Sequence, residues 1–525
     1  MTSNQRLILA LTVSFVFFMA YTAIFPPKQV SSELNATVET NKQAGTTVGS
    51  TGFTDSGSVD LGHDTSATTV SSSDNAILAK LSGANYILTI DTLGRISQKE
   101  MLEEKFSDED TGNAKLVAET GAKPLYIRFA DKALNEEAIK TPYTSNVKEA
   151  NLVDGHVSVI LTQKLSSLTV VKNLTFYADG HYDVNIKLSE DKRYYVYLGM
   201  HPTFADKQMM SVEGVMVDTG DHLINIVEDG DASTMTSYND VNLVSSFSQY
   251  FASIFYALDK DTTVKVDRDR EDNPVAFIEG LQDFTFNGYI GPKDYLILEA
   301  IKPELVNAIE YGWFTFAAAP LFQLLMFLHG IVGNWGWAIV LLTLIIRLVL
   351  FPLTFKGMIS MQKLKEVSPK VKELQAKYKG DPQRMNAAVM ELYKKEGANP
   401  LGGCLPLLMQ IPVFFAIYRV LLNAVELKGA EWILWINDLA HMDPYFVLPI
   451  LMGASMYYQQ RITPSNFTDP MQEKIFRFLP VIFTFFFVTF PAGLVLYWLM
   501  NNIFSIAQQF VVNNKFKAMK KAKEV

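Results

Sequence analysis

The stretch Trp335 to Lys356, WGWAIVLLTLIIRLVLFPLTFK, is long and apolar enough to cross a bilayer as a helix. About 20 apolar residues span a hydrocarbon core of ~30 Å. Arg347 nevertheless lies close to the middle of this stretch. A guanidinium there costs at least ~2.5–3.5 kcal/mol on insertion scales, and a charge inside the membrane usually marks a functional site. The stretch therefore predicts a membrane protein with a charged site within the bilayer.

Two kinds of surroundings are open to Arg347. A structural arginine would pair with a buried acid or extend to the interface. However, no Asp or Glu lies inside another apolar run, and Lys356 is about 13 Å further along the helix. A functional arginine would face a polar, water-filled cavity within the membrane. We expect the second arrangement, with a satisfied structural arginine as the alternative.

The charges divide the chain into an acidic and a basic part. Residues 28–310 contain 24 Lys and Arg against 43 Asp and Glu, a net charge of −19. The remainder contains 22 against 12, a net charge of +10. The single cysteine, Cys404, excludes disulfides within the chain, and the seven histidines show no metal-ligand spacing. We predict an acidic domain joined to a basic membrane part, with no metal site and no cofactor.

The first 75 residues predict an anchor and a tether. Arg6 precedes the apolar run Leu7–Phe25, which is longer than the core of about 7–15 residues in a cleavable signal. We interpret residues 1–27 as an uncleaved transmembrane anchor with a cytoplasmic N-terminus. Residues 28–75 are rich in Ser, Thr, Gly and Asn and predict a disordered linker.

Residues 76–303 show the period-two pattern of β-strands. Apolar and polar residues alternate in His181–Leu188, and Asp179-Gly180 just before it predicts a hairpin turn. Similar strands are predicted at Tyr86–Ile90, His156–Leu161, Leu168–Val171 and Tyr194–Leu198. Together they predict one large antiparallel β-sandwich outside the cytoplasm.

Three histidines of this region, His156, His181 and His201, could suggest a sugar-active site. They are scattered, no pair of carboxylates accompanies them, and the alternation explains His181 as a residue on the solvent face. We interpret all three as structural, since a fold alone does not establish a function.

The segment Trp313–Val332 is long enough to span a membrane, but Pro320, Gln323 and His329 interrupt it. A further span here would also put the acidic domain and the basic loop after Lys356 on the same side. We therefore interpret residues 304–334 as an interfacial amphipathic helix.

Residues 357–399 predict an antiparallel helical hairpin that is too polar to enter lipid. One apolar seam recurs at spacings of three and four, and a second follows the turn at Gly380-Asp381-Pro382. Ser368-Pro369 predicts a kink or a restart within the first helix. The seams are Leu364, Val367, Val371, Leu374 and Tyr378, and then Met385, Val389 and Leu392.

Four further spans complete a core at residues 335–512, and a basic tail follows at residues 513–525. They are Leu405–Leu422, Tyr445–Gln460, Phe478–Phe490 and Leu494–Val512. With the anchor this makes six spans. Basic segments fall on alternate sides of them, which predicts cytoplasmic N- and C-termini.

Several strings resemble the signatures of the YidC membrane protein insertases. The longest is NPLGGCLPLLMQIPVFFAIY at Asn399–Tyr418. The others are YGWFTF (Tyr311–Phe316), VGNWG (Val332–Gly336), DPMQEKI (Asp469–Ile475) and FPAGLVLYW (Phe490–Trp498). In residues 28–300 only the size and the strand pattern are similar to the exported domain of bacterial members.

The resemblance implies an N-terminal anchor, a large periplasmic β-sandwich and a five-helix core. That core would enclose a hydrophilic groove open to the cytoplasm and lipid. Arg347, Thr343 and Gln410 would line the groove, and Phe414, Tyr497 and Trp498 would contact the substrate helix. Gln323 departs from the pattern, because the interfacial helix of the family usually carries basic residues.

The implied function is insertion of nascent transmembrane segments into the cell inner membrane, alone or with the Sec translocon, by a protein that works as a monomer among membrane lipids. No GxxxxGK[ST] motif occurs, so no nucleotide hydrolysis and no enzyme activity are expected. Basic residues would contact the ribosome: Lys370, Lys372, Lys377, Lys379, Lys515, Lys517, Lys520 and Lys521. The alternatives are a secondary transporter, although we see no internal repeat, and a membrane-anchored carbohydrate enzyme.

Overall fold

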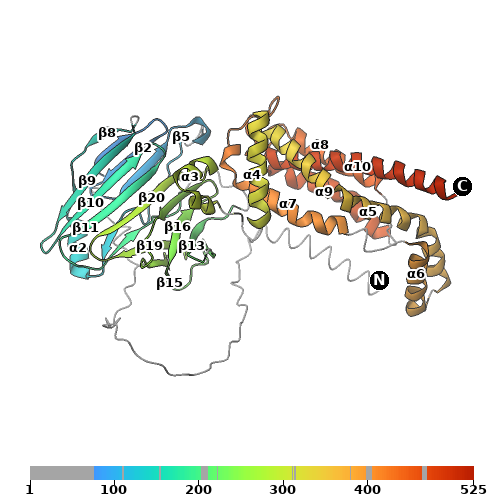
Figure 1. Cartoon of the computed structure of the whole chain (residues 1–525), viewed down its shortest axis with the longest axis horizontal. Helices are drawn as coiled ribbons and strands as arrows, with labels where there is room; N and C mark the ends of the chain where they lie inside the picture. The colour runs from blue at the N-terminus through green and yellow to red at the C-terminus, as the bar shows by residue number, and fades with distance from the viewer. Residues whose placement is uncertain are drawn as a thin grey trace, which may run out of the picture. The chain divides into compact units, whose positions relative to one another are not determined.

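The computed structural model describes residues 76–108, 112–152, 155–202, 211–221, 223–309, 311, 315–378, 380–397, 405–463 and 470–524. The described residues form two compact units, a β-rich unit that ends at Ala308 and a helical unit that begins at Ile309 (Figure 1). The predicted anchor at Leu7–Phe25 and the predicted linker at 28–75 lie outside the described residues.

The β-rich unit is built on a nine-stranded antiparallel sheet (Figure 1). Its strands lie in the order β14 (Ile224–Glu228), β13 (Gly214–Thr219), β16 (Val241–Phe247), β17 (Phe251–Tyr256), β20 (Phe284–Pro292), β11 (His181–Leu188), β10 (Thr169–Tyr177), β9 (His156–Lys164) and β7 (Thr144–Ser145).

Three smaller sheets and short helices complete this unit. The five-stranded sheet has the order β15 (Thr236–Tyr238), β18 (Val264–Arg268), β19 (Pro274–Gly280), β12 (Tyr194–Tyr197) and β6 (Ile127–Phe129). The four-stranded sheet has the order β3 (Ile96–Met101), β2 (Tyr86–Asp91), β1 (Ile77–Ser82) and β8 (Glu149–Asn151), in which β8 runs parallel to β1. The remaining elements are β4 (Ser107–Asp108), β5 (Gly112–Asn113), η2 (Glu104–Phe106), α2 (Lys132–Lys140), α3 (Tyr295–Ile301) and η3 (Pro303–Ala308).

The central hairpin shows why the sandwich forms. On β10 and β11, Phe176 pairs with Tyr182 and Leu174 with Val184, and all four side chains are at most 1% exposed. The alternate residues of both strands are partly buried or exposed, so each strand contributes one face to the core. Gly180 supplies the positive φ of +95° that the turn needs. The predicted hairpin and the predicted β-rich fold are confirmed.

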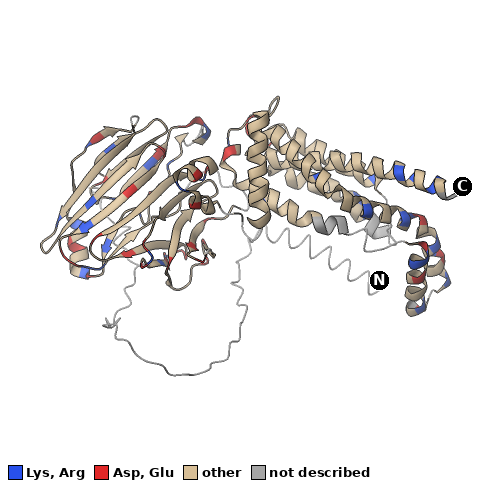
Figure 2. Cartoon of the chain, viewed as in Figure 1, with Lys and Arg blue, Asp and Glu red and all other residues tan. Residues whose placement is uncertain are grey.

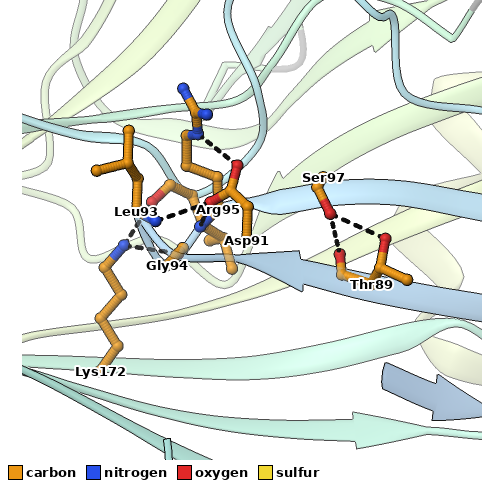
Figure 3. A network of polar contacts seen from close by, with 8 residues as sticks. Thr89, Asp91, Leu93, Gly94, Arg95, Ser97 and Lys172 are labelled. Carbon is orange, nitrogen blue, oxygen red and sulfur yellow. Dashed lines mark hydrogen bonds and ion pairs between the residues drawn. The ribbon is translucent and has the colours of Figure 1, made fainter. Parts of the chain in front are cut away.

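A buried polar network lies inside the β-rich unit (Figure 3). Asp91 and Arg95 form an ion pair of 2.8 Å whose side chains are 0% and 6% exposed. The Nζ of Lys172 donates to the carbonyl oxygens of Gly94 (2.9 Å) and Leu125 (2.8 Å). Burial lowers the pKa of Lys172 to about 7, although the charge of Asp91 acts in the opposite direction. Both groups that accept from Lys172 are neutral backbone carbonyls. Lys172 thereby links β10 to the segments that contain Gly94 and Leu125.

The helical unit contains seven described α-helices and two short 3₁₀ turns. They are α4 (Thr315–Val332), α5 (Trp335–Lys377), α6 (Pro382–Glu396), α7 (Leu405–Asn423), η6 (Val425–Leu427), α8 (Val447–Ile462), α9 (Pro470–Phe486), η7 (Phe487–Thr489) and α10 (Ala492–Glu524). Helix α10 packs against α5 and α8, α8 packs against α9, and α4 packs against α5 and α7. Figure 2 shows the charged residues of this unit gathered on α6 and toward the C-terminal end of α10.

Helix α5 begins at Trp335, within the VGNWG string. The side chain of Asn334 caps the helix by accepting from the backbone N–H of Trp337 (3.1 Å), and its amide donates to the carbonyl of Glu431 (3.0 Å). A Cβ on Gly336 would collide with the ring of Trp432. The helix start is therefore fixed against the loop before α8, which accounts for glycine at this position.

Helix α5 continues without interruption through Pro352 and Pro369 to Lys377. The restart predicted at Ser368-Pro369 is therefore wrong. The apolar seam holds the helix together there, because Leu364, Val367 and Val371 are buried against Val389 and Leu392 of α6. Five residues of the predicted seam thus pack together: Leu364, Val367, Val371, Val389 and Leu392. The limits of the hairpin stay a prediction.

Two of the described helices, α4 and α5, are long and apolar enough to cross a membrane. The apolar part of α7 is shorter, at Gln410–Asn423, and α8 and α9 have 16 and 17 residues. Helix α10 runs unbroken to Glu524, so the segment predicted as a separate basic tail continues a helix. Whether α4 spans the membrane or lies on its surface stays a prediction.

Candidate functional site

The apolar stretch around Arg347 carries a narrow polar face inside the helical unit. Thr343 and Arg347 lie one turn apart on α5 and are 1% and 7% exposed. The hydroxyl of Thr343 donates to the carbonyl of Ile339 in its own helix (2.7 Å). Arg347 is thus the residue of this face whose side chain reaches another helix.

The partner of Arg347 is Asn501 on α10. The guanidinium Nε donates to the side-chain oxygen of Asn501 (2.7 Å), and Nη2 donates to its backbone carbonyl (3.2 Å). Both acceptors are neutral. No carboxylate within the described parts of the chain pairs with this arginine. A single asparagine therefore holds a nearly buried cation without neutralising it.

Further polar side chains continue this face of α10. Asn502 donates to Ser455 of α8 (3.1 Å), and Gln508 donates to the backbone carbonyl of Arg347 (3.0 Å). Gln509 donates to Asn513 (2.7 Å), which also accepts from Gln362 of α5. We call these residues and Arg347 the polar stripe; its members are Arg347, Gln362, Ser455, Asn501, Asn502, Gln508, Gln509 and Asn513.

The polar stripe has spare hydrogen-bonding capacity. The side-chain oxygen of Gln508 is buried and has no hydrogen-bond partner among the described residues. Amide and hydroxyl groups can each exchange one partner for another, because they donate and accept. A polar segment of another chain can therefore bind along the stripe at a lower free-energy cost than it would have in hydrocarbon.

An aromatic cluster lies around Trp498 of α10, one turn before Asn502 of the polar stripe. The ring of Trp498 is 4.7 Å from that of Phe414 on α7 and 4.8 Å from that of Phe487, measured between ring centroids. Phe483 of α9 is 6.1 Å away. Beside Phe414 on α7, Phe415 is 43% exposed. The cluster therefore joins α7, α9 and α10 and borders an exposed apolar surface.

The structure distributes the other predicted site residues over these two features. Tyr497 is 2% exposed and lies one turn before Asn501, just as its neighbour Trp498 lies one turn before Asn502. Gln410 is partly buried on α7, one turn before Phe414. The contact of Tyr497 with a substrate helix and the groove position of Gln410 stay predictions.

The predicted ribosome-contact lysines differ in their surroundings. Lys370 pairs with Glu396 (2.6 Å) and Lys520 with Glu366 (2.9 Å). The Nζ of Lys515 lies 5.3 Å from the ring centroid of Phe355. All seven of these lysines that the structure describes are exposed: Lys370, Lys372, Lys377, Lys515, Lys517, Lys520 and Lys521. Lys379 lies outside the described residues.

Sequence reasoning missed every member of the polar stripe except Arg347: Gln362, Ser455, Asn501, Asn502, Gln508, Gln509 and Asn513. A signal was present, because residues 501, 502, 505, 508 and 509 are polar at helical spacing within the apolar run Leu494–Val512. Potential metal ligands gather in one group among the described residues, and that group lies in the β-rich unit.

Two family models match the chain. The model described as "60Kd inner membrane protein" matches residues 327–521, and the "YidC periplasmic domain" model matches residues 81–324. Three relatives, each described as membrane protein insertase YidC, align along nearly the whole chain. The Campylobacter jejuni protein is 46% identical over 98% of this chain and 96% of its own length. The Wolinella succinogenes protein is 46% identical over 99% of this chain and 96% of its own length. The Helicobacter pylori protein is 44% identical over 99% of this chain and 97% of its own length.

The chain belongs to the YidC family of membrane protein insertases. The predicted resemblance is confirmed, and so is the insertase function. The β-rich unit is the YidC periplasmic domain, and the protein belongs to the inner membrane. YidC-family members are named as insertases that act on membrane proteins, a function distinct from the known classes of catalytic enzyme.

Proposed function

We propose that Arg347 and the polar stripe receive the polar extracytoplasmic segment of a nascent membrane protein. The observation that carries this proposal is that Arg347 is 7% exposed yet bonds to neutral groups of a single residue, Asn501. A positive charge that is positioned but not neutralised attracts an incoming carboxylate. A charge-assisted bond to that carboxylate is roughly twice as strong as a bond between neutral groups.

The polar stripe lowers the cost of moving such a segment. In hydrocarbon each unsatisfied polar backbone group costs several kcal/mol. Asn502, Gln508 and Gln509 offer donors and acceptors along α10 that can replace water partners one at a time. The segment therefore meets hydrogen-bonding groups at successive turns, and no hydrolysis step is needed to drive its passage.

The aromatic cluster provides the exit for the apolar part of the substrate. Phe414 and Trp498 border the exposed ring of Phe415, and apolar surface gains about 25 cal/mol per Å² when it leaves water. We propose that the substrate helix passes along this surface into lipid. In this arrangement the residues predicted for the groove, Arg347, Thr343 and Gln410, and those predicted for helix contact, Phe414, Tyr497 and Trp498, serve successive stages.

The test is insertion of two matched substrates that differ in the charge of the extracytoplasmic segment, normalised to the amount of folded insertase. Arg347→Lys keeps the positive charge and loses the planar fork, so it should retain much of the insertion. Arg347→Ala should lose insertion of the acidic substrate and affect the neutral one far less. An equal loss for both substrates would contradict the electrostatic role, and it would favour a structural arginine.

We propose the predicted topology of six spans, with the domain limits given from the sequence and both termini in the cytoplasm. The separation of the acidic region 28–310 from the basic residues beyond Lys356 supports it. A reporter fused after Thr40 should be exported, and one fused after Gly380 should stay cytoplasmic. If both fusions report the same side of the membrane, α4 spans the membrane and the six-span topology is wrong.

We propose that the protein acts as a monomer with the ribosome and the Sec translocon as partners. Lys372, Lys377, Lys517 and Lys521 are exposed, as sequence-independent contact with ribosomal RNA requires. Their substitution by Ala should reduce ribosome co-sedimentation at low salt, whereas unchanged co-sedimentation would leave them only a role in topology. Crosslinking to the Sec translocon and native mass spectrometry test the other two proposals.

A further inference from the structure

Three potential metal ligands of the periplasmic domain meet at the ends of three strands. His201 follows β12, Glu213 precedes β13 and Asp229 follows β14. One ligand atom from each residue lies within 4.8 Å of the other two. Nothing in the proposed insertion mechanism uses this group.

The backbone holds the two carboxylates side by side. Strands β13 and β14 are antiparallel, with Gly214 opposite Glu228. The N–H of Asp229 donates to the carbonyl of Glu213 (3.1 Å), which extends the ladder by one pair.

His201 supplies an imidazole directed at the carboxylates. Its Nε2 lies 2.8 Å from Oδ2 of Asp229, and its side chain is 9% exposed. Oδ1 of Asp229 is buried and has no hydrogen-bond partner among the described residues. Buried polar atoms without partners are rare in folded proteins, so each one calls for an explanation.

We propose that His201, Glu213 and Asp229 bind a divalent transition-metal ion of the zinc class. One imidazole nitrogen and two carboxylate oxygens form a ligand set that Zn²⁺ accepts at about 2.0–2.2 Å. A nitrogen and an oxygen 2.8 Å apart can both lie at that distance from one ion. Ca²⁺ fits poorly, because it takes about 6–8 oxygen ligands. Three protein ligands leave a coordination position for water or for a group from a partner.

The ion would connect the two sheets of the sandwich. β12 belongs to the five-stranded sheet, whereas β13 and β14 form one edge of the nine-stranded sheet. Binding would therefore fix the β13–β14 hairpin to the opposite sheet. Because a metal that binds only the folded state raises stability, removal of the ion should loosen this edge of the periplasmic domain first.

The experiment uses the full chain in detergent, carrying an affinity tag without histidine and stripped with a chelator. Zn²⁺ binding is measured by equilibrium dialysis with elemental analysis, and thermal unfolding is measured with and without Zn²⁺. We expect one tightly bound Zn²⁺ per chain, together with a higher unfolding temperature. Co²⁺ bound in place of Zn²⁺ should give the visible absorption of a nitrogen–oxygen site.

The matched control is His181→Ala, because His181 also pairs with an aspartate, Asp179, in the same domain but has no third potential ligand among the described residues. His181→Ala should keep the tight Zn²⁺ site and its thermal shift, and His201→Ala should lose both. Glu213→Gln preserves size and tests the site if His201→Ala fails to fold; its affinity should fall at least tenfold. The proposal is overturned if the wild type binds no tight Zn²⁺, or if His201→Ala and Glu213→Gln bind it as the wild type does.

Discussion

At the scale of single residues, Asn501 determines how Arg347 presents its charge. The amide of Asn501 orients the guanidinium through one side-chain bond and one backbone bond but carries no charge of its own. Aspartate has nearly the same shape and would form an ion pair at the same position. Exchanging Asn501 for Asp therefore changes the charge at this position and leaves the shape of the side chain nearly the same.

We therefore predict that Asn501→Asp reduces insertion of substrates with acidic extracytoplasmic segments by about tenfold or more. A buried charged hydrogen bond contributes about 1.5–3 kcal/mol, and the substrate would have to displace it. The same exchange at exposed Asn514 of α10 is the control and should have little effect. Insertion is measured relative to the amount of folded protein. Wild-type insertion of the acidic substrate by Asn501→Asp would show that the charge of Arg347 is not what the substrate meets.

Lys172 gives a second prediction at this scale. Burial lowers its pKa from 10.5 to about 7. Between pH 7 and pH 10 the unfolded chain therefore binds more protons than the folded domain, and the free energy of unfolding rises with pH. One such group contributes up to about 1.4 kcal/mol per pH unit in this window. Lys99 is buried in the same way and has its pKa lowered to about 7.

Replacing Lys172 by Met should thus remove about half of the pH dependence that the two lysines create. The measurement is urea unfolding of the periplasmic domain at pH 7, 8 and 9. Lys187→Met, at a side chain that is 55% exposed on the same sheet, is the control and should keep the wild-type slope. An unchanged slope in Lys172→Met would mean that Lys172 does not titrate between pH 7 and pH 9.

At the scale of secondary-structure elements, the hairpin of α5 and α6 depends on its seam more than on its charges. Val371 is 6% exposed and packs in the seam, whereas the Lys370–Glu396 pair lies in solvent. Hydrogen bonding and the charge of Lys370 lower the pKa of Glu396, but water screens the pair. The apolar contacts should therefore hold α6 in place.

We predict that Val371→Asp separates α6 from α5, because an unpaired carboxylate in the seam costs several kcal/mol. Lys370→Ala, one residue away, should leave the hairpin closed. Hydrogen exchange of the α6 amides distinguishes the two outcomes. Equal protection in both variants would show that α6 is held by contacts other than the seam.

The seam also shows which features of a single helix the sequence could predict and which it could not. The spacing of Leu364, Val367 and Val371 predicted the hairpin, because helical geometry places such residues on one face. Pro369 suggested a break that did not occur. A proline removes one backbone hydrogen bond, but the seam residues on both sides of it are packed against α6, and this packing keeps the helix continuous.

At the scale of the whole molecule, the periplasmic domain and the helical unit are separate compact units. The polar stripe and the aromatic cluster both lie in the helical unit. We predict that deleting residues 80–290, with a tether kept, leaves insertion largely intact. Adding Arg347→Ala to this deletion should then abolish insertion of acidic substrates, which confirms that the remaining activity uses the same site. Complete loss by a well-expressed deletion would show that the periplasmic domain takes part in insertion itself.

The sequence by itself determined the kinds of element, their approximate limits and the family. Alternation in His181–Leu188 and the apolar run around Arg347 are local patterns, and each follows from the geometry of one strand or one helix. The signature strings are local as well. Such features can be read along the chain because neighbouring residues create them.

Only the tertiary structure decided which distant residues meet. Asn501 is 154 residues from Arg347, and no spacing rule connects them. His201, Glu213 and Asp229 come from three strand ends, so the sequence indicated no metal site where the fold gathers three ligands. The physical reason is that contacts between elements depend on how whole faces pack and which strands pair, and these choices are made by the entire chain at once.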